Sequence, residues 1–165
     1  MANYCGFIEE SINEGYGLRS VIFISGCKHH CPNCHSQHTW DFNTGIKLDK
    51  EQQDNLILKM KNNPLLNGLT ICGGDPFYSC KDVTEFIKNV RLNIPKFDIW
   101  IYSGFTYEEI LYDPNMKELL DQCDVLIDGP FKEEEKDLTL KFKGSKNQRI
   151  IDIKKSSINN IILIE

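Results

Sequence analysis

The chain has 165 residues, of which 24 are acidic and 19 basic, so its formal net charge is −5. This length supports one domain with a hydrophobic core and is short for two. The charges are mixed, without the basic stripe that follows phosphates, so we expect no nucleic-acid partner. No stretch approaches the roughly 20 apolar residues of a membrane span, and the N-terminus lacks a signal-like pattern. We therefore expect a single cytoplasmic domain over residues 1–165, without a membrane partner.

Short apolar runs that are rich in β-branched and aromatic residues predict buried strands. In chain order these strands cover residues 21–24, 69–72, 99–102, 125–127 and 150–153. Segments with helical periodicity separate several of these strands. Because strand and helix alternate, the sequence predicts an α/β fold with βαβ units and a mostly parallel sheet. A closed eightfold barrel typically needs about 250 residues, so we expect a partial, open (βα) barrel.

N-terminal capping signals mark the predicted helices. Asp49 is suited to cap the first of them. Ser79 with Asp82, and Thr106 with Glu109, each show the spacing of a capping box and predict two further helix starts.

Two segments lie outside this alternation of strands and helices. Residues 132–146 are polar with both charge signs, which predicts a solvated loop. Residues 154–165 contain a run of isoleucines and a leucine, which predicts packing or strand pairing against a segment that the sequence does not identify.

Seven cysteines are a high number for a chain in a reducing compartment, where a disulfide framework is not expected. Three of them, Cys27, Cys31 and Cys34, share one predicted loop, residues 25–38, directly after the first predicted strand. Functional loops gather at the carboxyl ends of parallel strands. Thiolates suit zinc and iron–sulfur clusters, and a cluster held by only three cysteines keeps one iron open for a further ligand.

The same loop also fits a zinc-binding module without catalysis. His29, His30, His35 and His38 are candidates for a fourth ligand, and the spacing from Cys34 to His38 lies within the zinc-finger range. The cysteine segment alone leaves both interpretations open.

A second candidate loop follows the next predicted strand, where Gly73, Gly74, Asp75 and Pro76 stand in sequence. Paired glycines allow a backbone to approach a ligand closely. Gly-Gly-Asp-Pro is also common as a plain turn. Its place after a strand and downstream of the cysteines favours a functional loop.

Together the two motifs resemble the radical S-adenosylmethionine superfamily, which has Cys-x3-Cys-x2-Cys after the first strand and Gly-Gly-acid-Pro after the second. The resemblance implies that Cys27, Cys31 and Cys34 bind a 4Fe-4S cluster, whose fourth iron is chelated by the amino and carboxylate groups of S-adenosylmethionine. It also implies that Gly73 and Gly74 contact the amino group of that cofactor.

The resemblance implies further cofactor contacts around the last cysteine, at Asn33, at Cys34 and through the backbone of His35. The superfamily usually has an aromatic residue where this chain has Asn33, which is a departure from the pattern.

Within the superfamily the sequence is similar to the activating proteins of anaerobic ribonucleoside-triphosphate reductases. The segments that carry this similarity are 39–42, 73–76, 98–104, 125–131 and 144–149. Related activases often carry an inserted ferredoxin-like segment with extra cysteines, which this chain lacks.

The family reaction uses the reduced cluster to split S-adenosylmethionine into methionine and a 5'-deoxyadenosyl radical, which abstracts a hydrogen atom from a glycine of the reductase. The resemblance therefore implies the reductase as protein substrate and a flavodoxin-like electron donor. No general acid or base is needed, so the histidines are expected to be solvated or capping residues. A small-molecule radical enzyme similar to a deazapurine synthase is the alternative within the superfamily. The sequence leaves Ser103, Asp128 and Arg149 without an assigned role.

Overall fold

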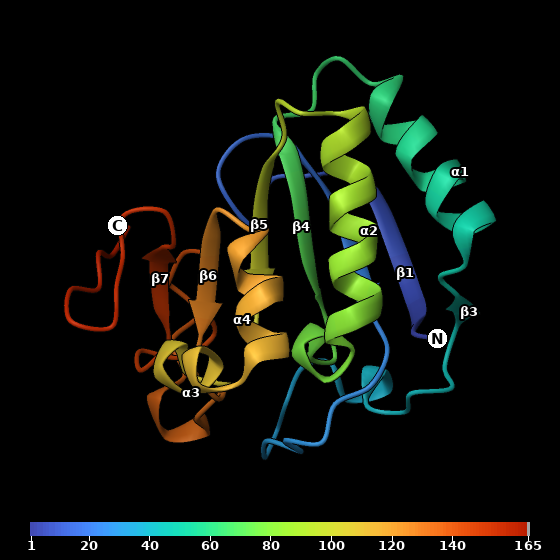
Figure 1. Ribbon diagram of the computed structural model, residues 1–165. Coiled ribbons are helices and arrows are strands. Elements are labelled where there is room, and N and C mark those ends of the chain that lie inside the picture. Colours follow the sequence, from blue (N-terminus) through green and yellow to red (C-terminus); the bar gives the residue numbers. More distant parts are fainter. Residues whose placement is uncertain (165) are drawn as a thin grey trace.

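A single seven-stranded sheet organises the protein (Figure 1). The computed structural model describes residues 1–164, and the strands lie in the order β3-β1-β2-β4-β5-β6-β7. Their bounds are β1 Asn3–Ser11, β2 Arg19–Ile24, β3 Ile46–Lys47, β4 Gly68–Gly73, β5 Asp98–Tyr102, β6 Val125–Asp128 and β7 Arg149–Asp152.

The four central strands, β2, β4, β5 and β6, are parallel to one another. The pairings at the two sides of the sheet, β1 with β2 and β3 and β6 with β7, are antiparallel. A mixed α/β sheet with mostly parallel strands is therefore confirmed, and all five predicted strands are present. The sequence did not predict β1 and β3. β1 is only partly buried and its second half carries Glu9 and Glu10, so it lacks the apolar run of a central strand.

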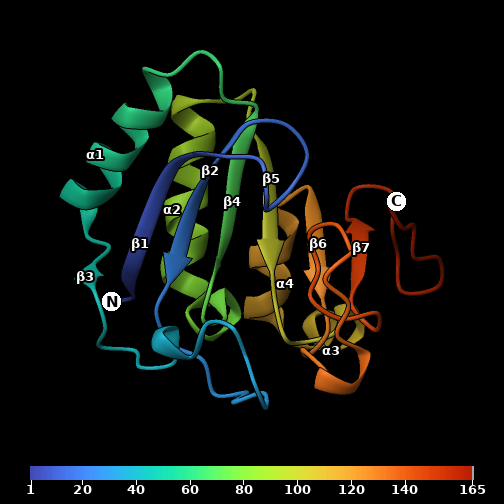
Figure 2. The same ribbon diagram turned by 180° about the vertical axis from the view of Figure 1, so that it is seen from behind.

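All four α-helices of residues 1–164 cover the same face of the sheet (Figure 1). Their bounds are α1 Lys50–Lys61, α2 Cys80–Asn93, α3 Tyr107–Tyr112 and α4 Pro114–Asp121. Within residues 1–164 the opposite face carries no α-helix, and the segment between β6 and β7, coloured orange, lies along part of it (Figure 2). Within residues 1–164, no helix combines the length and the apolar character that a membrane crossing requires.

The main core lies between the helices and the sheet. Phe86 and Val90 of α2 are fully buried in one cluster with Ile22, Ile71 and Ile101 of the central strands. Burial of one such side chain stabilises the fold by about 1.5–3 kcal/mol. This packing holds the carboxyl ends of β2, β4 and β5 beside one another, at the edge where a site was expected.

All three predicted helix starts are confirmed, because α1, α2 and α3 begin directly after Asp49, Ser79 and Thr106. The Asp49 carboxylate accepts a hydrogen bond from Gln52 N at 2.9 Å, and Thr106 and Glu109 form a reciprocal capping box. The capping box predicted for Ser79 and Asp82 is absent, because the Ser79 side chain makes no capping hydrogen bond to α2. Ser79 instead ends the short 3₁₀ helix Pro76–Tyr78, and its own N–H donates to the carbonyl of Pro76.

The segment 132–146 is a loop, as predicted, but it is not solvated throughout. The Phe142 ring packs edge-on against Tyr16 and Trp100, with ring centroids 5.0 and 5.5 Å apart. The Tyr102 hydroxyl donates a hydrogen bond of 2.5 Å to the carbonyl of Phe142. The middle of the loop therefore covers apolar side chains on the helix-free face of the sheet.

The isoleucine-rich tail finds its partner in β7. Ile164 N donates to Ile150 O at 2.8 Å, and Leu163 forms an antiparallel bridge with Ile151. The predicted strand pairing of residues 154–165 is confirmed for the part up to residue 164, and residue 165 lies outside the described residues.

Candidate functional site

The carboxyl ends of the central strands surround a cavity of about 320 Å³. This volume lies at the lower end of the range typical of small-molecule sites. The lining residues are Glu14, Phe23, Cys27, His29, Cys31, Cys34, His35, Ser36, Trp40, Cys72, Gly73, Gly74, Tyr102, Ser103, Gly104, Gly129, Phe131, Gly144 and Gln148. The cavity thus brings together every predicted site residue except Asn33.

The cysteine-bearing loop leaves the sheet after β2 and is closed at its base by two backbone hydrogen bonds. Gly26 N donates to Thr39 O at 2.7 Å, and Cys27 N donates to Trp40 O at 3.1 Å. Gly26 has φ of 107°, a conformation that favours glycine. We call residues 27–38 the cysteine loop.

Asn33 turns the cysteine loop without lining the cavity. It is exposed, and its φ of 57° is left-handed, a conformation that asparagine adopts more readily than bulky residues do. Asn33 therefore lets the chain reverse between Cys31 and Cys34, and Cys34 N donates to Cys31 O at 3.1 Å.

The three thiols of the cysteine loop differ in exposure. Cys27 is 8% exposed, whereas Cys31 and Cys34 are partly exposed. Burial raises the pKa of the Cys27 thiol to about 11, and burial also raises the pKa of Cys31. Metal binding to these residues would therefore displace protons.

The donor set of the cysteine loop fits a cluster. The three thiols line one cavity, so one bound group could reach all of them, and thiolates are the ligands that iron–sulfur clusters use. Ser36 N lies 3.4 Å from the Cys34 sulfur and donates to it. Hydrogen bonds of this kind tune iron–sulfur clusters.

The Gly-Gly turn after β4 is joined to the base of the cysteine loop. Gly74 N donates to Ile24 O at 2.8 Å, and Asp75 N donates to Gly26 O at 2.9 Å. A Cβ at Gly73 would lie 2.5 Å from Ile24 backbone atoms, and one at Gly74 would lie 2.5 Å from Gly26 O. Glycine is thus required at both positions because two backbones approach each other there.

The carboxylate of Asp75, which the sequence analysis left without a role of its own, is central to this end of the sheet. It is completely buried and accepts hydrogen bonds from Phe77 N at 3.0 Å, Ser103 Oγ at 2.9 Å and Gly104 N at 2.8 Å. A fourth contact joins it to His29 Nε2 at 2.7 Å. Its place after two glycines at a strand end was the only sequence signal for this role.

The expectation of solvated histidines is wrong for His29. Its side chain is 17% exposed, and its ring contacts those of Phe105 and Tyr78 at centroid distances of 4.5 and 5.2 Å. The other three histidines are exposed, as expected, although the ring of His30 stacks on Trp40.

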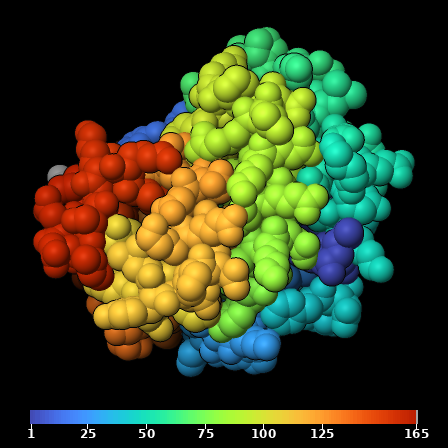
Figure 3. Space-filling view, viewed as in Figure 1, coloured from blue at the N-terminus to red at the C-terminus, as the bar shows by residue number. Residues whose placement is uncertain are grey.

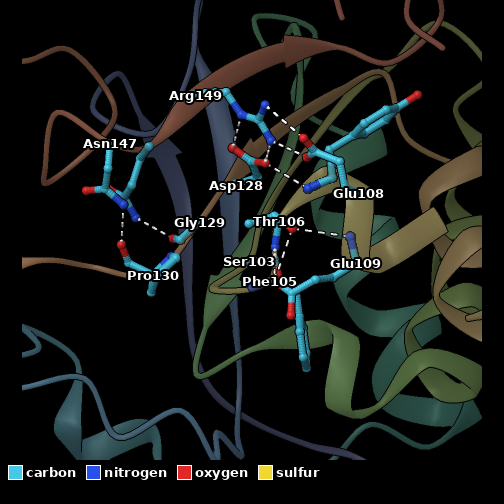
Figure 4. A network of polar contacts seen from close by, with 12 residues as sticks. Ser103, Phe105, Thr106, Glu108, Glu109, Asp128, Gly129, Pro130, Asn147 and Arg149 are labelled. Atoms are coloured by element: carbon cyan, nitrogen blue, oxygen red, sulfur yellow. Dashed lines mark hydrogen bonds and ion pairs between the residues drawn. The ribbon is translucent and has the colours of Figure 1, made fainter. Parts of the chain in front are cut away.

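A second buried carboxylate, that of Asp128, lies at the carboxyl end of β6 (Figure 4). Asp128 ends β6, and Arg149 begins β7. Arg149 donates to Asp128 Oδ2 at 2.5 Å and to Glu108 Oε1 at 2.6 Å, and Tyr107 N donates to Asp128 at 2.8 Å. None of these four residues lines the cavity, so the network joins β6, β7 and α3 and has a structural role.

The charges of this network shift the pKa values of its members. Hydrogen bonds to Asp128 and Glu108 raise the pKa of Arg149, and the hydrogen bond from Arg149 lowers that of Glu108. Nearby, amide groups fasten the segment after β6: Asn147 donates to Pro130 O at 2.7 Å, as Figure 4 shows.

Comparison with known proteins identifies the family of the chain. Residues 13–151 match the family described as a 4Fe-4S single cluster domain, so the protein belongs to a class that carries one iron–sulfur cluster. The chain is 33% identical to the anaerobic ribonucleoside-triphosphate reductase-activating protein of Pasteurella multocida (strain Pm70), over 90% of this chain and 96% of the relative. The proteins of that name from Vibrio cholerae and Escherichia coli (strain K12) are 34% and 32% identical, over 90% and 88% of this chain and 96% of each relative.

The chain belongs to the family of anaerobic ribonucleoside-triphosphate reductase-activating proteins. The resemblance drawn from the sequence motifs is therefore confirmed. Among solved structures, QueE from Escherichia coli aligns with a TM-score of 0.46 and 20% identity, over 64% of this chain and 54% of that one.

Proposed function

We propose that this protein cleaves S-adenosylmethionine reductively and generates a glycyl radical on an anaerobic ribonucleoside-triphosphate reductase. Cys27, Cys31 and Cys34 hold the 4Fe-4S cluster in this proposal. When bound, the cluster supplies the electron that splits the cofactor into methionine and a 5'-deoxyadenosyl radical, which takes a hydrogen atom from a glycine of the reductase. The family membership and the three thiols in one cavity support this function.

The single observation that carries the proposal is that the cysteine loop and the Gly-Gly turn line the same cavity. The N–H groups of Gly74 and Asp75 are committed to backbone carbonyls of the β2 end. An amino group of the cofactor donates hydrogen bonds, so Gly73 and Gly74 would meet it with carbonyl oxygens. Cys34, His35 and, through the turn it makes, Asn33 complete the proposed cofactor site.

The remaining work of the chain is to position the cofactor and shelter the radical. Aromatic rings of Phe23, Trp40 and Phe131 line the cavity and would limit the access of water. A glycine is suited as substrate because it has no side chain to obstruct its approach. We further propose that the sheet is an open, partial (βα) barrel whose helix-free side admits the reductase, and that the protein acts in the cytoplasm with a flavodoxin-like electron donor.

Anaerobic iron reconstitution followed by electron paramagnetic resonance tests the cluster assignment. The reduced wild-type protein should give a cluster signal that S-adenosylmethionine perturbs. Cys27→Ser, Cys31→Ser and Cys34→Ser should each lose that signal, because each removes one of three ligands.

Cys5→Ser is the matched control, since Cys5 lies on β1 and does not line the cavity. It should keep the signal. A wild-type protein that binds zinc and assembles no iron cluster would establish the zinc-binding module instead.

A further inference from the structure

His29 joins the cysteine loop to a carboxylate that is far away in sequence. It lies between Cys27 and Cys31, two residues from each. Its Nε2 is 2.7 Å from Asp75 Oδ2, and the two residues are 46 positions apart in the chain. The contact therefore links the middle of the cysteine loop to the end of β4.

Asp75 is held in place without any help from the cysteine loop. Phe77 N, Ser103 Oγ and Gly104 N all donate to its carboxylate, and its side chain is 1% exposed. These donors come from the 3₁₀ helix after β4 and from the segment after β5. The carboxylate is thus a fixed acceptor, and His29 is the group that reaches it from the loop.

The segment after β5 leaves room for the His29 ring. A Cβ on Gly104 would lie 2.7 Å from His29 Cδ2 and 2.9 Å from Nε2, so a larger residue would displace the imidazole. Phe105 and Tyr78 contact the ring from other directions. Glycine is therefore needed at position 104 because the His29 ring passes close to this backbone to reach Asp75.

We propose that His29 is a positioning residue, which fastens the cysteine loop to Asp75 and so holds Cys27 and Cys31 ready for the cluster. The proposal rests on the proposed function for the cluster itself. The base of the loop is fixed by the backbone bonds of Gly26 and Cys27, and His29 adds a fastening beyond that base. Removing a residue that orients metal ligands without binding the metal itself typically lowers metal affinity about 10- to 100-fold.

Three variants separate the hydrogen bond from the packing of the ring. His29→Phe keeps an aromatic ring against Phe105 and Tyr78 but removes the N–H. His29→Gln keeps a side-chain N–H that can donate to Asp75. His38→Phe makes the same substitution at an exposed position of the cysteine loop and serves as the matched control.

The first readout is hydrogen–deuterium exchange of residues 28–34 in the metal-free protein. We expect exchange about tenfold faster or more in His29→Phe, from the loss of one hydrogen bond to a charged group, and exchange near the wild-type rate in His29→Gln and His38→Phe. The midpoint of urea unfolding should stay near wild type in all three, because the loop opens locally. The second readout, loss of iron to a chelator after reconstitution, should follow the same order.

Gly104→Ala provides an independent variant, since it displaces the ring while His29 remains. It should speed exchange in the same loop. Wild-type exchange in His29→Phe would overturn the proposal, and equally fast exchange in His29→Phe and His29→Gln would overturn it in favour of ring packing. Failure of the proposed function would appear separately, as a wild-type protein that assembles no 4Fe-4S cluster. The exchange rates of the metal-free variants could still be compared in that case.

Discussion

Two buried aspartates at the carboxyl ends of parallel strands are satisfied in different ways. Asp128 accepts from the backbone N–H of Tyr107 and is paired with Arg149. Asp75 accepts from backbone and hydroxyl groups, and its partner from the cysteine loop is the imidazole of His29. Both carboxylates have side chains that are 1% exposed, so each depends on its partners for compensation.

The two networks differ in role: the Asp128 network stabilises the fold, and the Asp75 network also supports the candidate site. Arginine is permanently charged and presents a rigid fork, so the Arg149 pair stabilises the sheet edge under all ordinary conditions. His29 belongs to the loop that carries the cysteines, so its contact with Asp75 serves the site. We therefore expect changes in the first network to affect stability and changes in the second to affect iron binding as well.

Arg149→Met is expected to have the largest effect. It leaves the carboxylate of Asp128 buried without a cation, which should lower the free energy of unfolding by about 3 kcal/mol, at the lower end of the range for broken buried ion pairs because Arg149 is partly exposed. Urea unfolding measures this loss. The double variant Arg149→Met with Asp128→Asn should recover part of it, and no recovery would contradict an ion-pair origin.

Asp75→Ala should lower the free energy of unfolding less than Arg149→Met does, but it should impair iron binding more. It leaves Ser103 Oγ and the N–H groups of Phe77 and Gly104 without their acceptor, but it also removes a costly buried carboxylate, so we expect a net loss of about 2 kcal/mol. At a temperature where both variants are folded, Arg149→Met should retain reconstituted iron and Asp75→Ala should lose it. Equal retention of iron by the two would remove the distinction between the networks.

Thr106→Ala removes the cap of α3, the helix that contributes Glu108 to the edge network. Loss of a capping side chain typically costs about 1 kcal/mol. Thermal or urea unfolding should show this decrease, while iron content after reconstitution stays at the wild-type level. A loss of iron would show that α3 also supports the site.

Glu108→Gln should have the smallest effect and should depend on pH. The hydrogen bond from Arg149 lowers the pKa of Glu108 in the folded protein, so its contribution is present above the unfolded pKa of about 4.3 and disappears as pH falls through the lower folded value. Because Glu108 is 44% exposed, the contribution is less than about 1 kcal/mol. Wild-type stability should therefore fall slightly more than that of Glu108→Gln between pH 5 and pH 3, and parallel curves would contradict the assignment.

The sequence predicted the features that are encoded locally. The central strands are buried on both faces and appear as apolar runs, whereas β1 carries Glu9 and Glu10 and gave no such run. Cys27, Cys31 and Cys34 were found because ligand spacing is a local pattern, and all three line the cavity.

Contacts between segments that are distant in sequence could not be predicted from local sequence patterns. The reach of His29 to Asp75 depends on how β2, β4 and β5 are placed side by side, and on the absence of a side chain at Gly104. In the same way, the glycines of the Gly-Gly turn were attributed to a ligand, and the structure adds that they permit a close approach of two backbones. α2 begins after Ser79 as predicted, but the Ser79 side chain does not cap it, and the same residue ends the preceding 3₁₀ helix.

The central claim is that this protein places a radical on its reductase. The most direct test is electron paramagnetic resonance of an anaerobic mixture of reconstituted protein, reductant, S-adenosylmethionine and anaerobic ribonucleoside-triphosphate reductase. We expect a glycyl doublet on the reductase that requires all four components and is absent with Cys34→Ser. A cluster signal that responds to S-adenosylmethionine without any doublet would contradict the proposed substrate and favour a small-molecule radical enzyme.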